Sequence, residues 1–142
     1  MFWLELKFNT HGRHMSLQWN DGYKIGDEDI DAQHQQLFKL VNTVLAAKDK
    51  GTLTNCAMAL FQYTREHFAH EEQLMKRLQY PAMTAHKAQH ESLISRLSEV
   101  AARIANNTLD HQVLEAFLSD WLLNHIATSD VKLAAYIHAN VE

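Results

Sequence analysis

The 142-residue chain has few of the residues that interrupt or crosslink a polypeptide: one cysteine, one proline and four glycines. The single cysteine, Cys56, forms no disulfide within the chain, which excludes a disulfide-stapled fold and a metal site built from several thiolates. This cysteine usage agrees with a reducing compartment, and we expect a cytoplasmic protein. Because proline and glycine break regular structure, their scarcity predicts long helices.

The chain also lacks a basic run and a long apolar run. Thirteen Lys and Arg stand against seventeen Asp and Glu, a net charge of −4, without a basic cluster of the kind that follows a phosphate backbone. No window approaches the roughly 20 apolar residues of a membrane span. The first 14 residues are too short and too charged for a signal peptide. We therefore expect neither nucleic acid nor a membrane as a partner.

The length fits one domain with a substantial core, since 46% of the 142 residues are apolar. Residues 1–15 show no clear pattern and Met15 is an alternative start, so we interpret them as an N-terminal extension, either native or a cloning remnant. Residues 16–142 form the expected domain. It opens with an irregular arm, 16–29, which contains two glycines and scattered aromatic residues.

Four segments after the arm carry apolar or histidine residues at steps of three and four, the spacing of one helix face. They cover about 29–48, 54–78, 84–104 and 113–133. The stretch KDKGTLTN, Pro81 and the stretch ANNTLD separate them, and no alternating strand pattern of useful length competes. Because short connections place neighbouring helices antiparallel, the predicted fold class is all-α: an up-down-up-down four-helix bundle with an irregular N-terminal arm.

Polar residues occupy positions that this period reserves for the core, where an unpaired charge or imidazole is costly. On the second predicted helix, His67 and Glu71 lie four residues apart on one face, as do His86 and His90 on the third. Two carboxylates suit bridging, and mixed imidazole and carboxylate donors favour Fe, Mn or Zn, so we predict a dinuclear metal site. Its seven donors are His34, His67, Glu71, His86, His90, His125 and Asp130.

The last two donors pose a geometric problem. His125 and Asp130 are five residues apart, and at about 100° per residue an α-helix turns about 140° past a full circle over that interval. An ideal helix therefore does not direct both side chains to one site. We predict a π-type bulge, a local unwinding or a helix end between them.

The other histidines fall outside this pattern, and we expect them in the arm, on helix flanks or in solvent, with His70 at the edge of the donor face. They are His11, His14, His70, His111 and His138. Glu66 and Glu72 are expected to be solvated or to orient an imidazole from outside.

At these motifs the sequence resembles the hemerythrin family, in particular its single-domain bacterial members. The matching stretches are IDAQH, HFAHEEQLM, YPAMTAHKAQH and WLLNHIATSD, and the resemblance covers about 19–136. It implies two non-heme iron ions with a solvent-derived oxo or hydroxo group between them. One iron would be held by His86, His90 and His125, the other by His34 and His67, and both would be bridged by Glu71 and Asp130.

The resemblance also implies reversible O2 binding, for carriage, storage or sensing, at the open position of the two-histidine iron. Phe68, Leu122 and Ile126 follow or flank the donors, and we expect them to wall a dry O2 pocket. NO and peroxide are alternative ligands of this position. The sequence also leaves open an unidentified protein partner.

Two alternative functions remain at this stage. The first is an enzyme: a di-iron oxidase or peroxidase, or a protein that repairs iron centres or handles NO. The second is the sensory domain of a signalling protein. Oxygen-activating di-iron enzymes use mostly carboxylates, whereas five neutral imidazoles favour the ferrous state. The donor composition therefore favours a binding protein over an enzyme.

Overall fold

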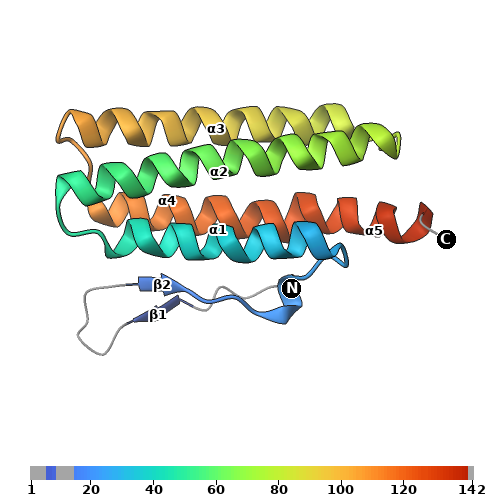
Figure 1. The fold of residues 1–142 in the computed structure, drawn as a ribbon, viewed down its shortest axis with the longest axis horizontal. Helices are drawn as coiled ribbons and strands as arrows, with labels where there is room; N and C mark the ends of the chain where they lie inside the picture. Colours follow the sequence, from blue (N-terminus) through green and yellow to red (C-terminus); the bar gives the residue numbers. More distant parts are fainter. Residues whose placement is uncertain (1–5, 9–14, 141–142) are drawn as a thin grey trace.

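Four helical rods lie side by side in the computed structural model, which describes residues 6–8 and 15–140 (Figure 1). The rods are α1 (Glu28–Ala46), α2 (Lys50–Arg77), α3 (Met83–Ala105) and a fourth that combines α4 (His111–Asn124), a π-helical segment (His125–Asp130) and α5 (Val131–Asn140). Successive rods run in opposite directions (Figure 1). The predicted all-α, up-down-up-down four-helix bundle is confirmed.

The helix bounds follow from local hydrogen bonding. Asp27, Asp49 and Asp110 each accept a hydrogen bond from a backbone N–H two or three residues later and so begin α1, α2 and α4. After α2 and α3, Gln79 and Asn107 adopt positive φ angles of 54° and 58°, a common way to end a helix. Because the cap lies at residue 49, α2 begins four residues earlier than the periodicity predicted.

The described residues before α1 are more regular than expected, both in the extension and in the arm. Strand β1 (Leu6–Phe8) pairs antiparallel with β2 (Met15–Leu17), and a 3-10 turn covers Asp21–Tyr23. Leu17 is buried, and its backbone N–H and carbonyl both bond the Asn42 amide of α1 at 2.7 Å. The arm therefore lies along α1 (Figure 1). The division into residues 1–15 and 16–142 stays a prediction, and His11 and His14 lie outside the described residues.

Two apolar clusters fill the interior. Along three of the rods, a buried donor residue separates the residues of one cluster from those of the other. The larger cluster includes Leu37, Phe68 and Ile126. The smaller one includes Ile30 and its neighbours Leu74, Met75 and Leu133 from other rods. In α1, α2 and the fourth rod the chain therefore passes from one cluster to the other through a buried donor.

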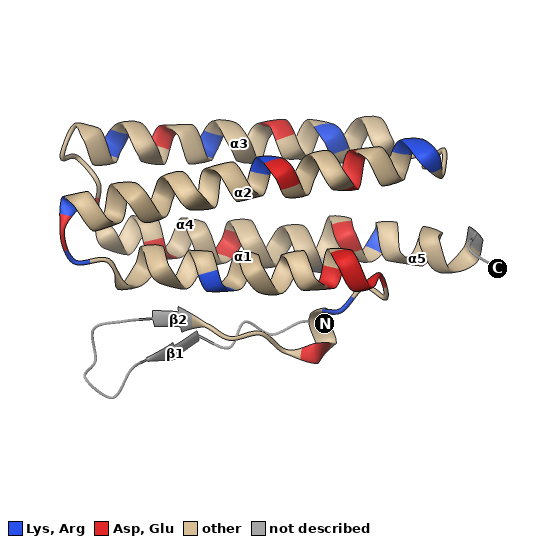
Figure 2. Cartoon of the chain, viewed as in Figure 1, with Lys and Arg blue, Asp and Glu red and all other residues tan. Residues whose placement is uncertain are grey.

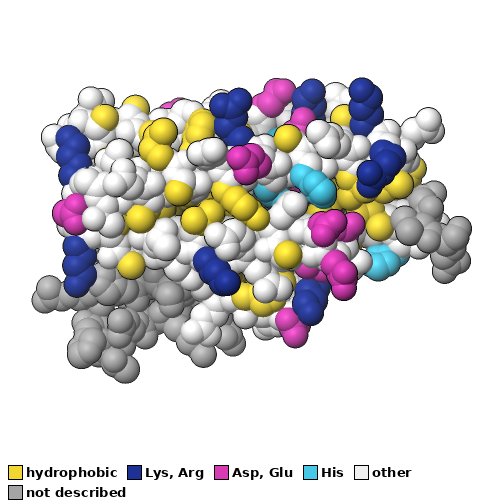
Figure 3. All heavy atoms as spheres, viewed as in Figure 1, with side chains coloured by type: hydrophobic (Ala, Val, Ile, Leu, Met, Phe, Trp, Pro, Cys, Tyr) yellow, Lys and Arg dark blue, Asp and Glu magenta, His cyan; other side chains and the backbone are white. Residues whose placement is uncertain are grey.

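Charged side chains of both signs are distributed over the outside of the bundle (Figures 2 and 3). Acidic residues gather at the start of α1, where Glu28, Asp29 and Asp31 lie in the first turn and negative charge stabilises the helix. Within the described residues, no helix is both long and apolar enough to cross a membrane. The cytoplasmic location stays a prediction.

Candidate metal centre

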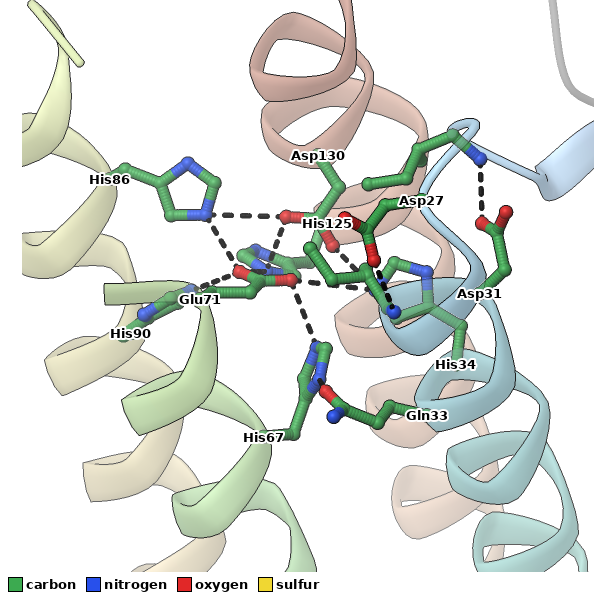
Figure 4. Close-up of polar contacts among 12 residues, drawn as sticks. Asp27, Asp31, Gln33, His34, His67, Glu71, His86, His90, His125 and Asp130 are labelled. Carbon is green, nitrogen blue, oxygen red and sulfur yellow. Dashed lines mark hydrogen bonds and ion pairs between the residues drawn. The ribbon is translucent and has the colours of Figure 1, made fainter. Parts of the chain in front are cut away.

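The structure brings all seven predicted donors into one buried region between the four rods (Figure 4). Each rod contributes at least one of them. They are His34 from α1, His67 and Glu71 from α2, His86 and His90 from α3, and His125 and Asp130 from the π-helical segment.

The Glu71 carboxylate lies between two groups of imidazoles. Its Oε1 is 3.0 Å from His90 Nε2 and 3.1 Å from His86 Nε2. Its Oε2 is 3.0 Å from His67 Nε2 and 3.5 Å from His34 Nε2. The two oxygens thus face different groups, which is the arrangement that a bridging carboxylate requires.

Asp130 spans the same two groups. Its Oδ1 lies 3.2 Å from both His86 Nε2 and His125 Nε2, and its Oδ2 lies 2.8 Å from His34 Nε2. Both carboxylates therefore have one oxygen toward a group of three imidazoles and one oxygen toward a group of two. This partition agrees with the one that the family resemblance implied.

The irregular stretch predicted between His125 and Asp130 is a π-helix, which begins at His125 and ends at Asp130. In a π-helix the backbone bonds join residues five apart, so residues at that spacing lie about one turn from each other. The prediction of irregularity is confirmed, and the bulge explains how one rod supplies both donors.

The donor atoms fit a metal. Among the described residues, several of these buried atoms have no hydrogen-bond partner, although buried polar atoms are rarely left unpaired. They are both ring nitrogens of His34 and of His125, Nε2 of His67, Oε2 of Glu71 and both oxygens of Asp130. Adjacent donors bound to one metal at roughly 2.0–2.2 Å lie about 3 Å apart. The nitrogen–oxygen distances match this spacing.

The donors also divide into two sets small enough for one ion each. Within each set, one donor atom per residue lies within 4.8 Å of all the others. One set is Glu71, His86, His90 and His125, and the other is His34, His67, Glu71 and Asp130. Glu71 belongs to both sets, so two adjacent cations would share it.

Three of the imidazoles have a raised pKa in the metal-free protein. Burial is the largest influence and lowers their pKa, but the negative Asp130 and Glu71 carboxylates lie close to their ring nitrogens and together outweigh it. The pKa rises to about 9 at His34, about 8 at His86 and about 10 at His125.

The other shifted groups complete the charge balance. At His67 burial prevails over the attraction of Glu71, and the pKa is lowered. Burial raises the pKa of the Glu71 carboxyl, but His67 and the other imidazoles reverse this effect and hold it well below its usual value. The pKa of the Asp130 carboxyl is likewise lowered. Burial and repulsion by Glu71 raise it, but the contacts with His125 and His34 outweigh both. In the metal-free protein, protons on the imidazoles therefore neutralise the two buried carboxylates. In the metal-bound protein, the cations would take this role.

Two residues hold imidazoles from outside. Glu72 Oε2 accepts a hydrogen bond from His90 Nδ1 at 3.0 Å, as the sequence allowed, whereas Glu66 is exposed. Gln33 Oε1 lies 2.7 Å from His67 Nδ1 and was missed. The helical period did not indicate Gln33, because it precedes the donor His34 directly and so lies off the donor face of α1.

An apolar pocket adjoins the centre on the side of the larger cluster. It has about 190 Å³ of space between atoms but no position wide enough for a water molecule. The three residues expected in an O2 pocket, Phe68, Leu122 and Ile126, all line it, together with Leu37, Trp121, His34 and His125. Trp121 and Leu37 were not among the residues expected to line it. The Phe68 ring also stacks on His90, with centroids 3.8 Å apart, and so fixes that donor.

The three described histidines that were not predicted as donors, His70, His111 and His138, belong to neither donor set. His111 is exposed and His70 is half-buried. His138 bonds the Ile25 carbonyl at 3.1 Å and joins α5 to the arm.

Comparison with known proteins agrees with this geometry. A model of the hemerythrin HHE cation binding domain matches residues 25–137. A bacteriohemerythrin from Stenotrophomonas maltophilia is 33% identical over 128 residues, 88% of this chain and 84% of that protein. One from Pseudomonas paraeruginosa is 35% identical over 126 residues, 87% of this chain and 80% of that protein.

More distant relatives share the fold. A myohemerythrin from Riftia pachyptila is 27% identical and covers 80% of this chain and 88% of its own length. A crystal structure of wild-type hemerythrin superposes with a TM-score of 0.76 at 25% identity, over 84% of this chain and 95% of that one. Since the family model spans most of the sequence and bacterial relatives above 30% identity cover nearly all of it, the chain belongs to the hemerythrin family and resembles its bacterial members.

Proposed function

We propose that the chain binds two iron ions between these seven donors and takes up O2 reversibly beside the two-imidazole group. His86, His90 and His125 would hold one ion, His34 and His67 the other, and Glu71 and Asp130 both. The observation that carries the proposal is that each buried carboxylate has one oxygen on each imidazole group. When bound, the irons would supply the two electrons that O2 accepts.

The chain's own residues make the two positions unequal. The three-imidazole group has one protein donor more than the two-imidazole group, so the second position offers more room for an external ligand. The apolar pocket reaches this second group through His34, and it also touches His125 of the three-imidazole group. Its lining of Phe68, Leu122 and Ile126 excludes water and limits the access of solvent protons to a bound ligand.

The test combines metal analysis with spectroscopy. Iron-reconstituted protein should hold two ions per chain, and the anaerobically reduced form should develop a new absorption band on exposure to air that disappears when O2 is removed. A single ion per chain would contradict the proposed centre. With an added reductant, the protein could instead consume many O2 molecules per centre and show no reversible spectral change. This result would contradict reversible binding and indicate an oxidase.

A further inference from the structure

The outer nitrogens of two donor imidazoles bond side chains of different charge. His67 Nδ1 donates to the neutral amide oxygen of Gln33, which the neighbouring helix α1 supplies (Figure 4). His90 Nδ1 donates to the carboxylate of Glu72, which α2 supplies to α3. In both rings the other nitrogen, Nε2, lies 3.0 Å from a Glu71 oxygen.

Each of these bonds selects one tautomer. An acceptor at Nδ1 keeps the hydrogen there and leaves the Nε2 lone pair for a cation. The contacts are short, at 2.7 Å for Gln33 and 3.0 Å for Glu72, and both rings are buried. Gln33 and Glu72 therefore orient His67 and His90 before any cation arrives.

Two of the other three donor imidazoles have no such partner in the described part of the site. The outer nitrogens of His34 and His125 are buried and, among the described residues, have no hydrogen-bond partner. Glu72 thus places a negative charge behind the three-imidazole group, and Gln33 places none behind the two-imidazole group. A carboxylate partner makes an imidazole a stronger donor than an amide partner does.

We propose that Glu72 and Gln33 are positioning residues that make the two halves of the metal centre electronically unequal. Glu72, through His90, strengthens cation binding at the three-imidazole group and favours the higher oxidation state there. Gln33, through His67, leaves the two-imidazole group more electron-poor, so a metal there stays reduced more readily. This inference rests on the proposed two-metal function and assigns the unequal behaviour to two specific side chains.

The experiment exchanges the two partners without changing their shape. Glu72→Gln and Gln33→Glu each preserve an acceptor oxygen, and the double variant keeps the net charge of the protein. Zn(II) serves as the probe, with stepwise affinities from competition against a chelator and with histidine ring NMR to show which group binds first. Glu99→Gln and Gln62→Glu are matched controls, since both residues are exposed on α3 and α2.

We expect wild-type protein to fill the three-imidazole group first. Glu72→Gln should weaken that step by about 10- to 100-fold. Gln33→Glu should strengthen the second step, and the double variant should reduce or invert the order of filling. In iron-loaded protein, each single change should also narrow the separation between the two reduction potentials. The controls should leave both measurements unchanged.

The outcomes distinguish a failure of the proposed two-metal function from a failure of the roles assigned to Glu72 and Gln33. Binding of fewer than two Zn(II) ions by the wild type would overturn the proposed function. Two ions in every variant, with unchanged stepwise affinities and an unchanged order of filling, would overturn the inference alone. If circular dichroism shows that Glu72→Gln does not fold, Gln33→Glu alone still decides it, because the inference predicts a stronger second step in that variant and an unchanged second step would contradict it.

Discussion

Asp130 Oδ1 lies 3.2 Å from His125 Nε2, although the two residues are five positions apart on one helical rod. In an α-helix that spacing would separate the side chains by about 140° around the axis. The π-helical segment removes this separation and gives the centre an imidazole and a carboxylate from the same rod. It also places Asp130 Oδ2 at 2.8 Å from His34, so the second group depends on the same carboxylate.

Asp130→Asn should reduce the metal content from two ions per chain to roughly one. The amide keeps the volume of the carboxylate but offers one neutral oxygen in place of two charged ones, so it cannot bridge two cations. Metal analysis after anaerobic loading with Fe(II), and separately with Zn(II), measures this loss. Asp120→Asn is the control, because Asp120 is an exposed carboxylate on α4. Two ions bound by Asp130→Asn with wild-type affinity would refute the bridging role.

The sequence predicted the bundle and the convergence of the donors because both depend on the helical period, which runs through the first three rods and through the fourth as far as His125. It also predicted the irregularity near Asp130, since the angular mismatch follows from spacing alone. The role of the seven residues as metal ligands stays a prediction. The start of α2 was misplaced, because the Asp49 cap overrides the breaker signal of Gly51, which lies inside the first turn.

Other features depend on contacts between distant segments, and the local pattern carries no signal for them. The β1–β2 hairpin needs pairing between residues 6–8 and 15–17, too short an alternation to recognise in sequence. The bond from Gln33 to His67 joins residues 34 positions apart. The contribution of Trp121 to the pocket wall likewise follows from a side-chain contact inside the bundle, where the ring centroids of Phe68 from α2 and Trp121 from α4 lie 6.5 Å apart.

Leu122→Ala should leave both metals bound and accelerate autoxidation of the O2 complex. Leu122 donates to no metal and lines the apolar pocket, so its truncation admits water beside the two-imidazole group. The measurement is the decay of the oxygenated spectrum after stopped-flow mixing of reduced protein with air.

Leu114→Ala provides the matched control for this change. Leu114 is as buried as Leu122 and lies on the same helix, but it does not line the pocket. Both truncations should lower the free energy of unfolding by about 2–5 kcal/mol. Only Leu122→Ala should change the decay rate, and equal acceleration by both would attribute the effect to general destabilisation.

Metal uptake near pH 7 should release protons. The pKa values of His34, His86 and His125 in the metal-free protein are about 9, 8 and 10, so these imidazoles carry protons at neutral pH. Cations bind neutral imidazole, and loading with Zn(II) in weakly buffered solution should release roughly two to three protons per chain. The release should shrink as the pH rises through about 8 to 10, because the protons then leave before the metal binds. Uptake without proton release at pH 7 would contradict the charge balance.

Gly26→Ala should destabilise the fold at the junction of the arm and α5. Gly26 has a φ of +95°, and a Cβ there would clash with the His138 ring at Nε2. The ring must move and lose its bond to the Ile25 carbonyl, and the backbone conformation stays strained. We expect a loss of about 1–3 kcal/mol in the free energy of unfolding, measured by denaturant titration of metal-free protein.

Gly51→Ala is the opposite case and serves as the control. Gly51 lies in the first turn of α2 without a positive φ, and its added Cβ would lie 3.4 Å from an Asp49 oxygen, an ordinary contact. Alanine there should leave stability unchanged or raise it by up to about 1 kcal/mol. A Gly26→Ala change in a His138→Ala background separates the two costs, because the clash is then absent and the strain remains. If Gly26→Ala costs nothing in that background, the ring contact with His138 accounts for the whole effect and backbone strain for none.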